Sequence, residues 1–121
     1  MRIRFVLAIS LLAFAAACSD SPSTPTPTPT PGPGTAVSIV TGAAGLTTTA
    51  YTPNPITVAV GGTVTWMNND SITHTSTANG GAWNSGNMAP GANFSTTFPS
   101  AGTFQYHCTI HPGMVGTITV Q

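Results

Sequence analysis

The sequence predicts an all-β domain, an antiparallel sandwich or barrel of about seven to eight strands, and three observations carry this prediction. Short runs rich in β-branched and aromatic residues recur from Thr35 to the end of the chain. Turn-forming clusters such as "GG" at 61–62, "NGG" at 79–81 and "PSAG" at 99–102 separate these runs at even spacing. No segment of this region has the periodicity of an amphipathic helix. Such a pattern is typical of sandwiches and barrels.

The expected strands follow one another along this region. Their residue ranges are 36–41, 48–52, 55–60, 63–69, 72–77, 92–98, 103–108 and 115–120. Successive side chains on a strand point to opposite faces, so the alternation of apolar residues predicts which side chains point inward. These are Val37, Ile39, Ile56, Val58, Val60, Val64, Trp66, Phe94, Phe98, Ile118 and Val120. In the strand 103–108 the aromatic face carries Phe104, Tyr106 and Cys108 inward, which turns His107 outward.

Residues 1–17 are typical of an export signal peptide. Arg2 and Arg4 precede the apolar run 5–17, which is shorter than the ~20 residues that a membrane span needs. Cys18 follows "AAA" directly and resembles the cysteine of a bacterial lipoprotein cleavage box, although Ala15 stands where such boxes usually carry leucine. We therefore expect Cys18 to be the lipidated first residue of the mature chain. The alternative is an ordinary signal peptide cleaved near Ala17.

Residues 18–34 combine this cysteine with a Thr/Pro-rich tether. Alternating proline removes every second amide hydrogen and fixes φ, so this segment predicts an extended polyproline-type spacer rather than a helix or strand. The folded domain is expected at 35–121. The whole protein is expected to be exported, to the periplasm or the cell surface, and held at the membrane only by the lipid on Cys18.

The charged residues exclude several functions. They are Arg2, Arg4, Asp20 and Asp70, so everything after residue 4 has no lysine or arginine. Binding to nucleic acid or to anionic lipid headgroups requires several such cations. A single domain carboxylate cannot form the acid and base pair of many hydrolases, and no nucleophile elbow is present. The inventory of histidines is also too small for a multicopper oxidase. We therefore expect a protein that is not an enzyme.

The stretch "YHCTIHPGM" at 106–114 concentrates the metal-binding residue types of the chain. Cys108 is the only cysteine of the domain, so no internal disulfide can form, and a free thiol in an oxidising compartment has to be buried or ligated. A buried structural cysteine is the alternative, but it leaves His111 and Met114 unexplained. Thiolate, thioether and imidazole together favour copper. Pro112 and Gly113 keep this segment from continuing as a helix, and His74 is the remaining candidate for a fourth ligand.

The run from Ala50 to Val120 resembles the cupredoxins, the type 1 blue copper proteins, and looks most like the plastocyanin and amicyanin branch. The resemblance is carried by "AYTPNPITVAVGGTVTWMNND", by His74, by "SGNMAPGANFSTTFPSAGTFQYHC" and by the short Cys-x2-His-x2-Met spacing of "CTIHPGMVGTITV". It implies a Greek-key β-sandwich with one copper ion in a type 1 site. The resemblance places His74, Cys108 and His111 in a trigonal set, with Met114 as the long axial ligand.

The function that this resemblance implies is one-electron transfer between redox partners. His111 would be the electron port, and the candidates for an apolar patch around it are Ile110, Pro112, Met88 and Pro90. We expect a monomer that docks through this patch on a cytochrome or redox enzyme, with little dependence on salt. The alternative function is copper storage or delivery without electron transfer.

The remaining polar and aromatic residues have simpler expected roles. Trp66 and Trp83 are expected to anchor the core and a loop, Met67 to lie at the surface, and Asp70 to cap a turn. Many cupredoxins have asparagine after the first histidine ligand, where its side chain ties the two ligand loops together. Here the residue is Thr75, whose hydroxyl can make only part of that link.

Overall fold

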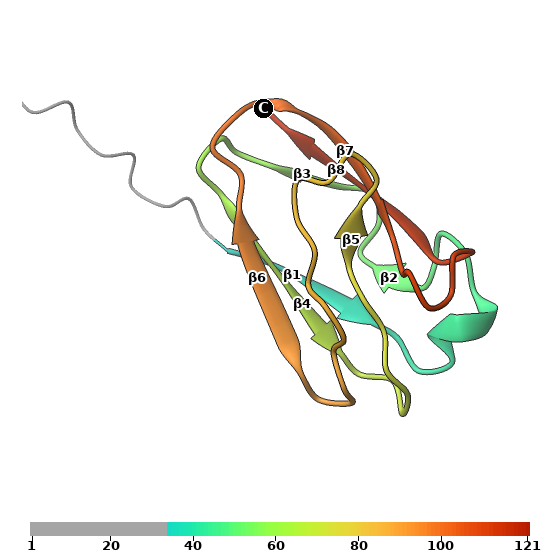
Figure 1. Cartoon of the computed structure of the whole chain (residues 1–121). Helices are drawn as coiled ribbons and strands as arrows, with labels where there is room; N and C mark the ends of the chain where they lie inside the picture. The colour runs from blue at the N-terminus through green and yellow to red at the C-terminus, as the bar shows by residue number, and fades with distance from the viewer. Residues whose placement is uncertain (1–33) are drawn as a thin grey trace, which may run out of the picture.

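Two four-stranded sheets face each other in the computed structural model, which describes residues 34–121 (Figure 1). The signal peptide, Cys18 and nearly all of the tether predicted from the sequence lie outside these residues. Within them, no helix is long and apolar enough to span a bilayer. The elements are β1 (Thr35–Ile39), the 3-10 turn η1 (Ala43–Gly45), β2 (Tyr51–Thr52), β3 (Ile56–Val58), β4 (Thr63–Asn68), β5 (Thr77–Ala78), β6 (Asn93–Thr97), β7 (Gly102–His107) and β8 (Val115–Val120).

The sheet orders are β2-β1-β4-β6 and β3-β8-β7-β5, which confirms the all-β Greek-key sandwich. The expectation of purely antiparallel sheets is wrong, because β1 pairs with β4 in parallel and β3 pairs with β8 in parallel. Each of these pairs joins strands that are not consecutive, so each connection has to cross from one sheet to the other. The remaining pairs are antiparallel.

The core lies between the sheets and is formed largely by the side chains that alternation predicted. Trp66, Val64, Ile39 and Ile118 are completely buried. Trp66 lies at the centre of an aromatic cluster, with ring centroids 5.5 Å from both Trp83 and Tyr106. Three side chains depart from the inward positions expected for them, and one is Phe104, which is only half-buried. Phe94 is only half-buried, and Val60 is 47% exposed because β3 ends at Val58, before the turn at 61–62.

The predicted strand 72–77 is the largest error of the sequence-based assignment. The structure has only the short strand β5 at Thr77–Ala78, preceded by an isolated bridge between His74 and Met88. Polar side chains take over the backbone partners that a sheet would use. Asn68 donates from Nδ2 to the carbonyls of Ile72 (2.7 Å) and Met88 (2.9 Å), and its Oδ1 accepts from the Asp70 N–H. The segment is therefore an ordered loop rather than a strand.

Candidate metal centre

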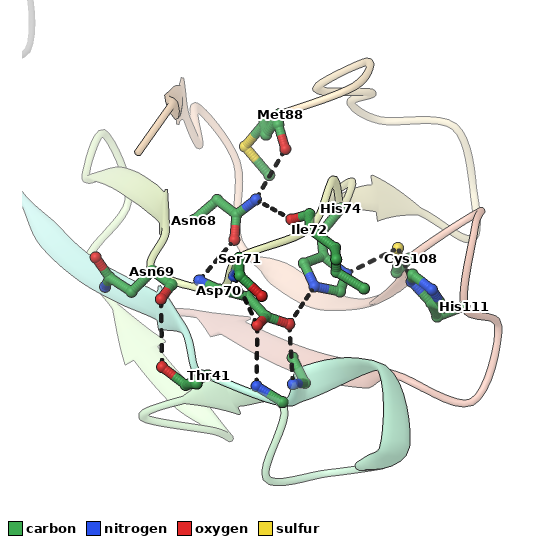
Figure 2. Close-up of polar contacts among 12 residues, drawn as sticks. Thr41, Asn68, Asn69, Asp70, Ser71, Ile72, His74, Met88, Cys108 and His111 are labelled. Carbon is green, nitrogen blue, oxygen red and sulfur yellow. Dashed lines mark hydrogen bonds and ion pairs between the residues drawn. The ribbon is translucent and has the colours of Figure 1, made fainter. Parts of the chain in front are cut away.

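Three donor side chains converge at one end of the sandwich. The Cys108 Sγ lies 3.8 Å from the Nδ1 of His74 and 3.8 Å from the Nδ1 of His111 (Figure 2). The ligand atoms of these three residues all lie within 4.8 Å of one another. Cys108 and His74 are fully buried, whereas His111 is half-buried. The imidazole of His74 therefore reaches the cysteine, as expected for a shared site, but from a loop rather than from the predicted strand 72–77.

The second half of the centre is one short loop between β7 and β8. Cys108 follows β7 directly and its N–H donates to the Met114 carbonyl at 3.1 Å, while the Met114 N–H donates to the His111 carbonyl at 2.9 Å. These two hydrogen bonds close the loop that Pro112 and Gly113 predicted. The Met114 side chain is fully buried, whereas His111 in the same loop is half-buried.

His74 is held on both sides. Its backbone N–H donates to the Met88 carbonyl (3.1 Å), and the Met88 N–H donates back to the His74 carbonyl (2.8 Å). Its side-chain Nε2 lies 2.8 Å from the Asp70 Oδ2. An ionised carboxylate only accepts hydrogen bonds, so the proton of the neutral imidazole is on Nε2 and the lone pair of Nδ1 faces Cys108. This is the tautomer that a metal ligand needs.

Asp70 does more than cap a turn, and its contact with His74 was missed by the sequence analysis. Its carboxylate also accepts hydrogen bonds from the N–H groups of Gly42 (3.0 Å), Ala43 (3.2 Å) and Ser71 (2.8 Å). The hydrogen bond from His74, followed by those from Gly42 and Ser71, holds the pKa of the Asp70 carboxyl well below its ordinary value. The four-residue spacing from Asp70 to His74 was the only sequence signal, and no helical periodicity supported it.

The Cys108 sulfur accepts one backbone hydrogen bond, from the Thr75 N–H at 3.3 Å. The Thr75 hydroxyl also joins the two ligand loops, because its Oγ1 accepts from the Thr109 N–H at 2.9 Å. The same oxygen lies 3.2 Å from the Thr109 hydroxyl and 3.2 Å from the Thr77 hydroxyl. A hydroxyl therefore supplies a direct bond between the loops at the position where asparagine is common.

A buried tyrosine, Tyr51, supports the loop that contains His74 and Thr75. The Tyr51 hydroxyl donates to the Thr75 carbonyl at 2.6 Å, and the Tyr51 ring packs edge-on against Tyr106 at a centroid distance of 4.8 Å. Burial, and then the neighbouring Cys108, raise the pKa of Tyr51 far above its ordinary value. Tyr51 therefore remains a neutral hydrogen-bond donor beside the sulfur.

The donor set fits copper. Ligands at ~2.0 Å for nitrogen and ~2.3 Å for sulfur around one ion lie roughly 3.5–4 Å apart when they are arranged trigonally, and the two sulfur–nitrogen separations of 3.8 Å agree with this spacing. Two imidazoles, one thiolate and a nearby thioether are the soft and intermediate donors that favour copper over magnesium, calcium or manganese. Among the described residues, no oxygen-rich cluster competes with this group of donors.

The other predicted residues divide between surface and core. Ile110 is 45% exposed, and Pro112 and Pro90 are exposed. Met88 is wrong as a patch residue, since it is 2% exposed and its backbone is paired with His74. Trp83 is also buried and its Nε1 donates to the Ser76 Oγ at 3.0 Å.

Two exposed apolar residues at this end were missed. Ile72 (43% exposed) lies two residues before His74, and Leu46 (36% exposed) follows η1, the turn whose Ala43 N–H contacts Asp70. Each stands alone in a polar loop, so no periodic pattern marked it in the sequence.

His107 takes no part in the centre. Its Nδ1 lies 2.7 Å from the Asn79 Oδ1, on the outer face of β7, and the ring is half-buried there. The outward direction expected for this side chain is confirmed. His107 is therefore a histidine that lies outside the donor cluster.

Comparison with known proteins gives consistent matches over this domain. A model of the copper binding proteins of the plastocyanin/azurin family matches residues 37–121. A plastocyanin from Scenedesmus fuscus is 39% identical over 84 residues, which cover 59% of this chain and 86% of that protein. An amicyanin from Paracoccus denitrificans is 37% identical over 76 residues, covering 59% of this chain and 58% of that protein.

Solved structures agree with these sequence matches. A purple cupredoxin from Nitrosopumilus maritimus superposes with a TM-score of 0.66 at 32% identity and covers 72% of this chain and 99% of that one. The fold, the donor cluster and the matched residues lead to one assignment. The chain belongs to the plastocyanin/azurin family of copper-binding proteins.

Proposed function

We propose that this protein is an exported one-electron carrier whose copper is held by His74, Cys108, His111 and Met114. The observation that carries the proposal is the convergence of two imidazole nitrogens and one thiol on a buried point, with a single ligand edge reaching the surface. Bound copper supplies the redox chemistry by alternating between its cupric and cuprous states. The chain supplies a fixed donor geometry and a route to the partner.

The protein's own contacts favour a rigid centre. The Thr75 N–H and hydroxyl tie the first ligand loop to Cys108 and Thr109, and the backbone bonds of Met114 close the second loop. Neither loop has to rearrange when an electron arrives, because every one of these hydrogen bonds is made by chain atoms rather than by solvent. A small rearrangement is what fast outer-sphere electron transfer requires.

The surface around His111 supports docking by apolar contact. His111 is half-buried, and Ile110, Pro112 and Pro90 are exposed beside it or on the adjoining loop, while Leu46 and Ile72 add apolar surface at the same end. Among residues 34–121 Asp70 is the only Asp, Glu, Lys or Arg, and it is buried, so no charged side chain rims this surface. A redox protein would therefore dock around His111 through the desolvation of apolar surface rather than through charge steering. We further propose that lipidated Cys18 and the Thr/Pro tether present this monomer at a membrane in the periplasm or at the cell surface.

The test is to add Cu(II) to the full chain and record the visible spectrum. Intense absorption from thiolate charge transfer is expected in the wild-type protein and in His107→Ala, which changes a histidine outside the cluster. Cys108→Ser is expected to lose the absorption. A colourless wild-type adduct would remove the type 1 assignment. Rapid electron exchange with a cytochrome supports the carrier, whereas slow exchange with ready release of copper to a chelator would favour storage or delivery.

A further inference from the structure

Asp70 is a single charge placed behind one of the proposed copper ligands. It is the only Asp or Glu in residues 34–121, and no Lys or Arg lies in the same range. Its side chain is almost fully buried, and its Oδ2 lies 2.8 Å from the Nε2 of His74. Figure 2 shows the Asp70 carboxylate beside the His74 imidazole. The carboxylate also accepts hydrogen bonds from the backbone N–H groups of Gly42 and Ala43. No lysine or arginine among residues 34–121 offsets the charge.

The contacts of this carboxylate are specific to a carboxylate. Oδ1 accepts from the N–H groups of Gly42 and Ser71, and Oδ2 accepts from Ala43 and from His74. Each oxygen therefore has two donors. An asparagine in the same place would direct its NH2 group at one of these pairs of donors, because an amide nitrogen does not accept hydrogen bonds. The site thus stabilises a negative charge and not merely a polar group of the same shape.

The consequence for the metal follows from charge arithmetic. One cysteine thiolate and the Asp70 carboxylate together balance the charge of a cupric ion, whereas a cuprous ion leaves one net negative charge in a largely buried site. A negative charge across the imidazole ring acts on the metal position through a medium of low effective dielectric, so it favours the higher oxidation state. The reduction concerned is Cu(II) plus one electron from a redox partner to Cu(I), with no proton transferred.

We propose that Asp70 is a positioning residue that holds His74 with Nδ1 toward Cys108 and biases the bound copper toward Cu(II), lowering its reduction potential. This inference rests on the proposed copper centre. The pairing with η1 adds a mechanical role, because the N–H groups of Gly42 and Ala43 anchor the carboxylate to a segment 28 and 27 positions upstream of Asp70. The imidazole is thereby fixed to the body of the domain rather than to its own loop alone.

The experiment compares Asp70→Asn, Asp70→Glu and the control Asn69→Ala in the copper-loaded full chain. Asn69 is the exposed neighbour, and its side chain bonds to Ser38 rather than to the centre. The reduction potential of Asp70→Asn is expected to shift upward, and the ratio of Cu(II) to Cu(I) affinity should fall by the matching factor. Asn69→Ala should leave both unchanged, and Asp70→Glu should restore most of the wild-type potential. The proposal would be overturned if Asp70→Asn retained the charge-transfer band and had the same reduction potential as Asn69→Ala.

A second pair of variants leaves the hydrogen bonds of Asp70 intact and covers the case in which Asp70→Asn does not fold. Thr41 is exposed beside Gly42, and its hydroxyl lies 3.4 Å from the Asn69 carbonyl. Thr41→Lys brings a cation toward the carboxylate, and Thr41→Gln is a control of similar length without charge. At low salt Thr41→Lys should have the higher potential, and the difference should shrink as salt is added, because an exposed charge is screened. Equal potentials at low salt would contradict a charge effect.

The metal-free protein provides a readout that does not depend on copper. Nitrogen NMR at mildly alkaline pH should show the wild-type His74 imidazole with its proton on Nε2, and Asp70→Asn should change this tautomer population. A wild-type imidazole protonated on Nδ1 would refute the positioning role. If the wild-type chain itself forms no coloured copper adduct, the proposed function fails instead, so the two failures are distinguishable.

Discussion

Gly116 provides a stringent test of the packing that supports the centre. It lies on β8 opposite Tyr106 of β7, and a Cβ atom built on it would come closer than 3.0 Å to the Cζ, Oη and Cε1 atoms of the Tyr106 ring. Gly116 is not among the glycines with positive φ, so Gly116→Ala changes steric packing without adding backbone strain. Tyr106 is two residues before Cys108, so this variant disturbs the strand that presents the sulfur.

The size of the effect follows from how little room the ring has. Ordinary contacts of a Cβ atom lie at 3.4–4 Å, so the ring has to move. Its neighbours Tyr51, Trp66 and Trp83 lie at centroid distances of 4.8, 5.5 and 5.7 Å, and all three are buried. Overpacking in a filled core costs about 1–3 kcal/mol and sometimes more, and this enclosed ring places the variant at about 3 kcal/mol. For a domain of 60–100 residues that loss lowers Tm by roughly 12–24 °C.

The assay is thermal and urea unfolding of the metal-free full chain, which removes the stabilisation that bound copper adds. Gly80→Ala is the matched control, because nothing lies within 4 Å of a Cβ at that position. Tyr106→Phe keeps the clashing ring carbons and should not rescue Gly116→Ala, whereas Tyr106→Leu should remove most of the penalty in a double-mutant cycle. A Gly116→Ala protein within about 4 °C of wild type, equivalent to less than about 1 kcal/mol, would refute the packing argument.

Three further outcomes are expected. Thr75→Ala removes the acceptor of the Thr109 N–H and should lower the free energy of unfolding by about 1–3 kcal/mol. Thr75→Ser is the control, because it retains this hydrogen bond. Equal stability of the two variants would show that the hydroxyl link contributes nothing. Burial raises the pKa of Tyr106 to about 12, so the folded state keeps a proton that the unfolded state releases from about pH 10 upward. Tyr106 should therefore contribute a loss of up to about 3 kcal/mol of stability as pH rises through 12. Tyr51, whose pKa burial raises further, adds a loss of the same sign in the wild type and in Tyr106→Phe. The wild type should therefore lose more than Tyr106→Phe over this range, and equal losses would exclude a contribution from Tyr106. Finally, the rate of electron exchange with a soluble cytochrome should vary little between low and high salt, and a steep fall would reveal charge steering that the described domain does not explain.

Local patterns in the sequence were sufficient for most of the fold. The strand β8 was predicted with its observed bounds, and the alternation in "GTFQYHC" placed Tyr106 and Cys108 on the buried face and His107 outside. These predictions succeed because the side chains of a strand alternate between its two faces with a period of two residues, a pattern that neighbouring residues in the sequence reveal directly. Asn68, the last residue of β4, bonds through its side chain to backbone carbonyls of the following segment, and there the same pattern predicted a strand that does not exist.

The sequence by itself determined the chemistry of the centre: one thiol, two imidazoles and one thioether in a chain almost without charge, within a β-rich domain. Only the tertiary structure decided which groups surround that chemistry. It buried Met88 and paired its backbone with His74. It left Leu46 and Ile72 exposed, and joined Asp70 to His74 on one side and to Gly42 and Ala43 on the other. The reason is that such contacts join loops far apart in the chain, and their partners are set by the crossing of two sheets rather than by any local period.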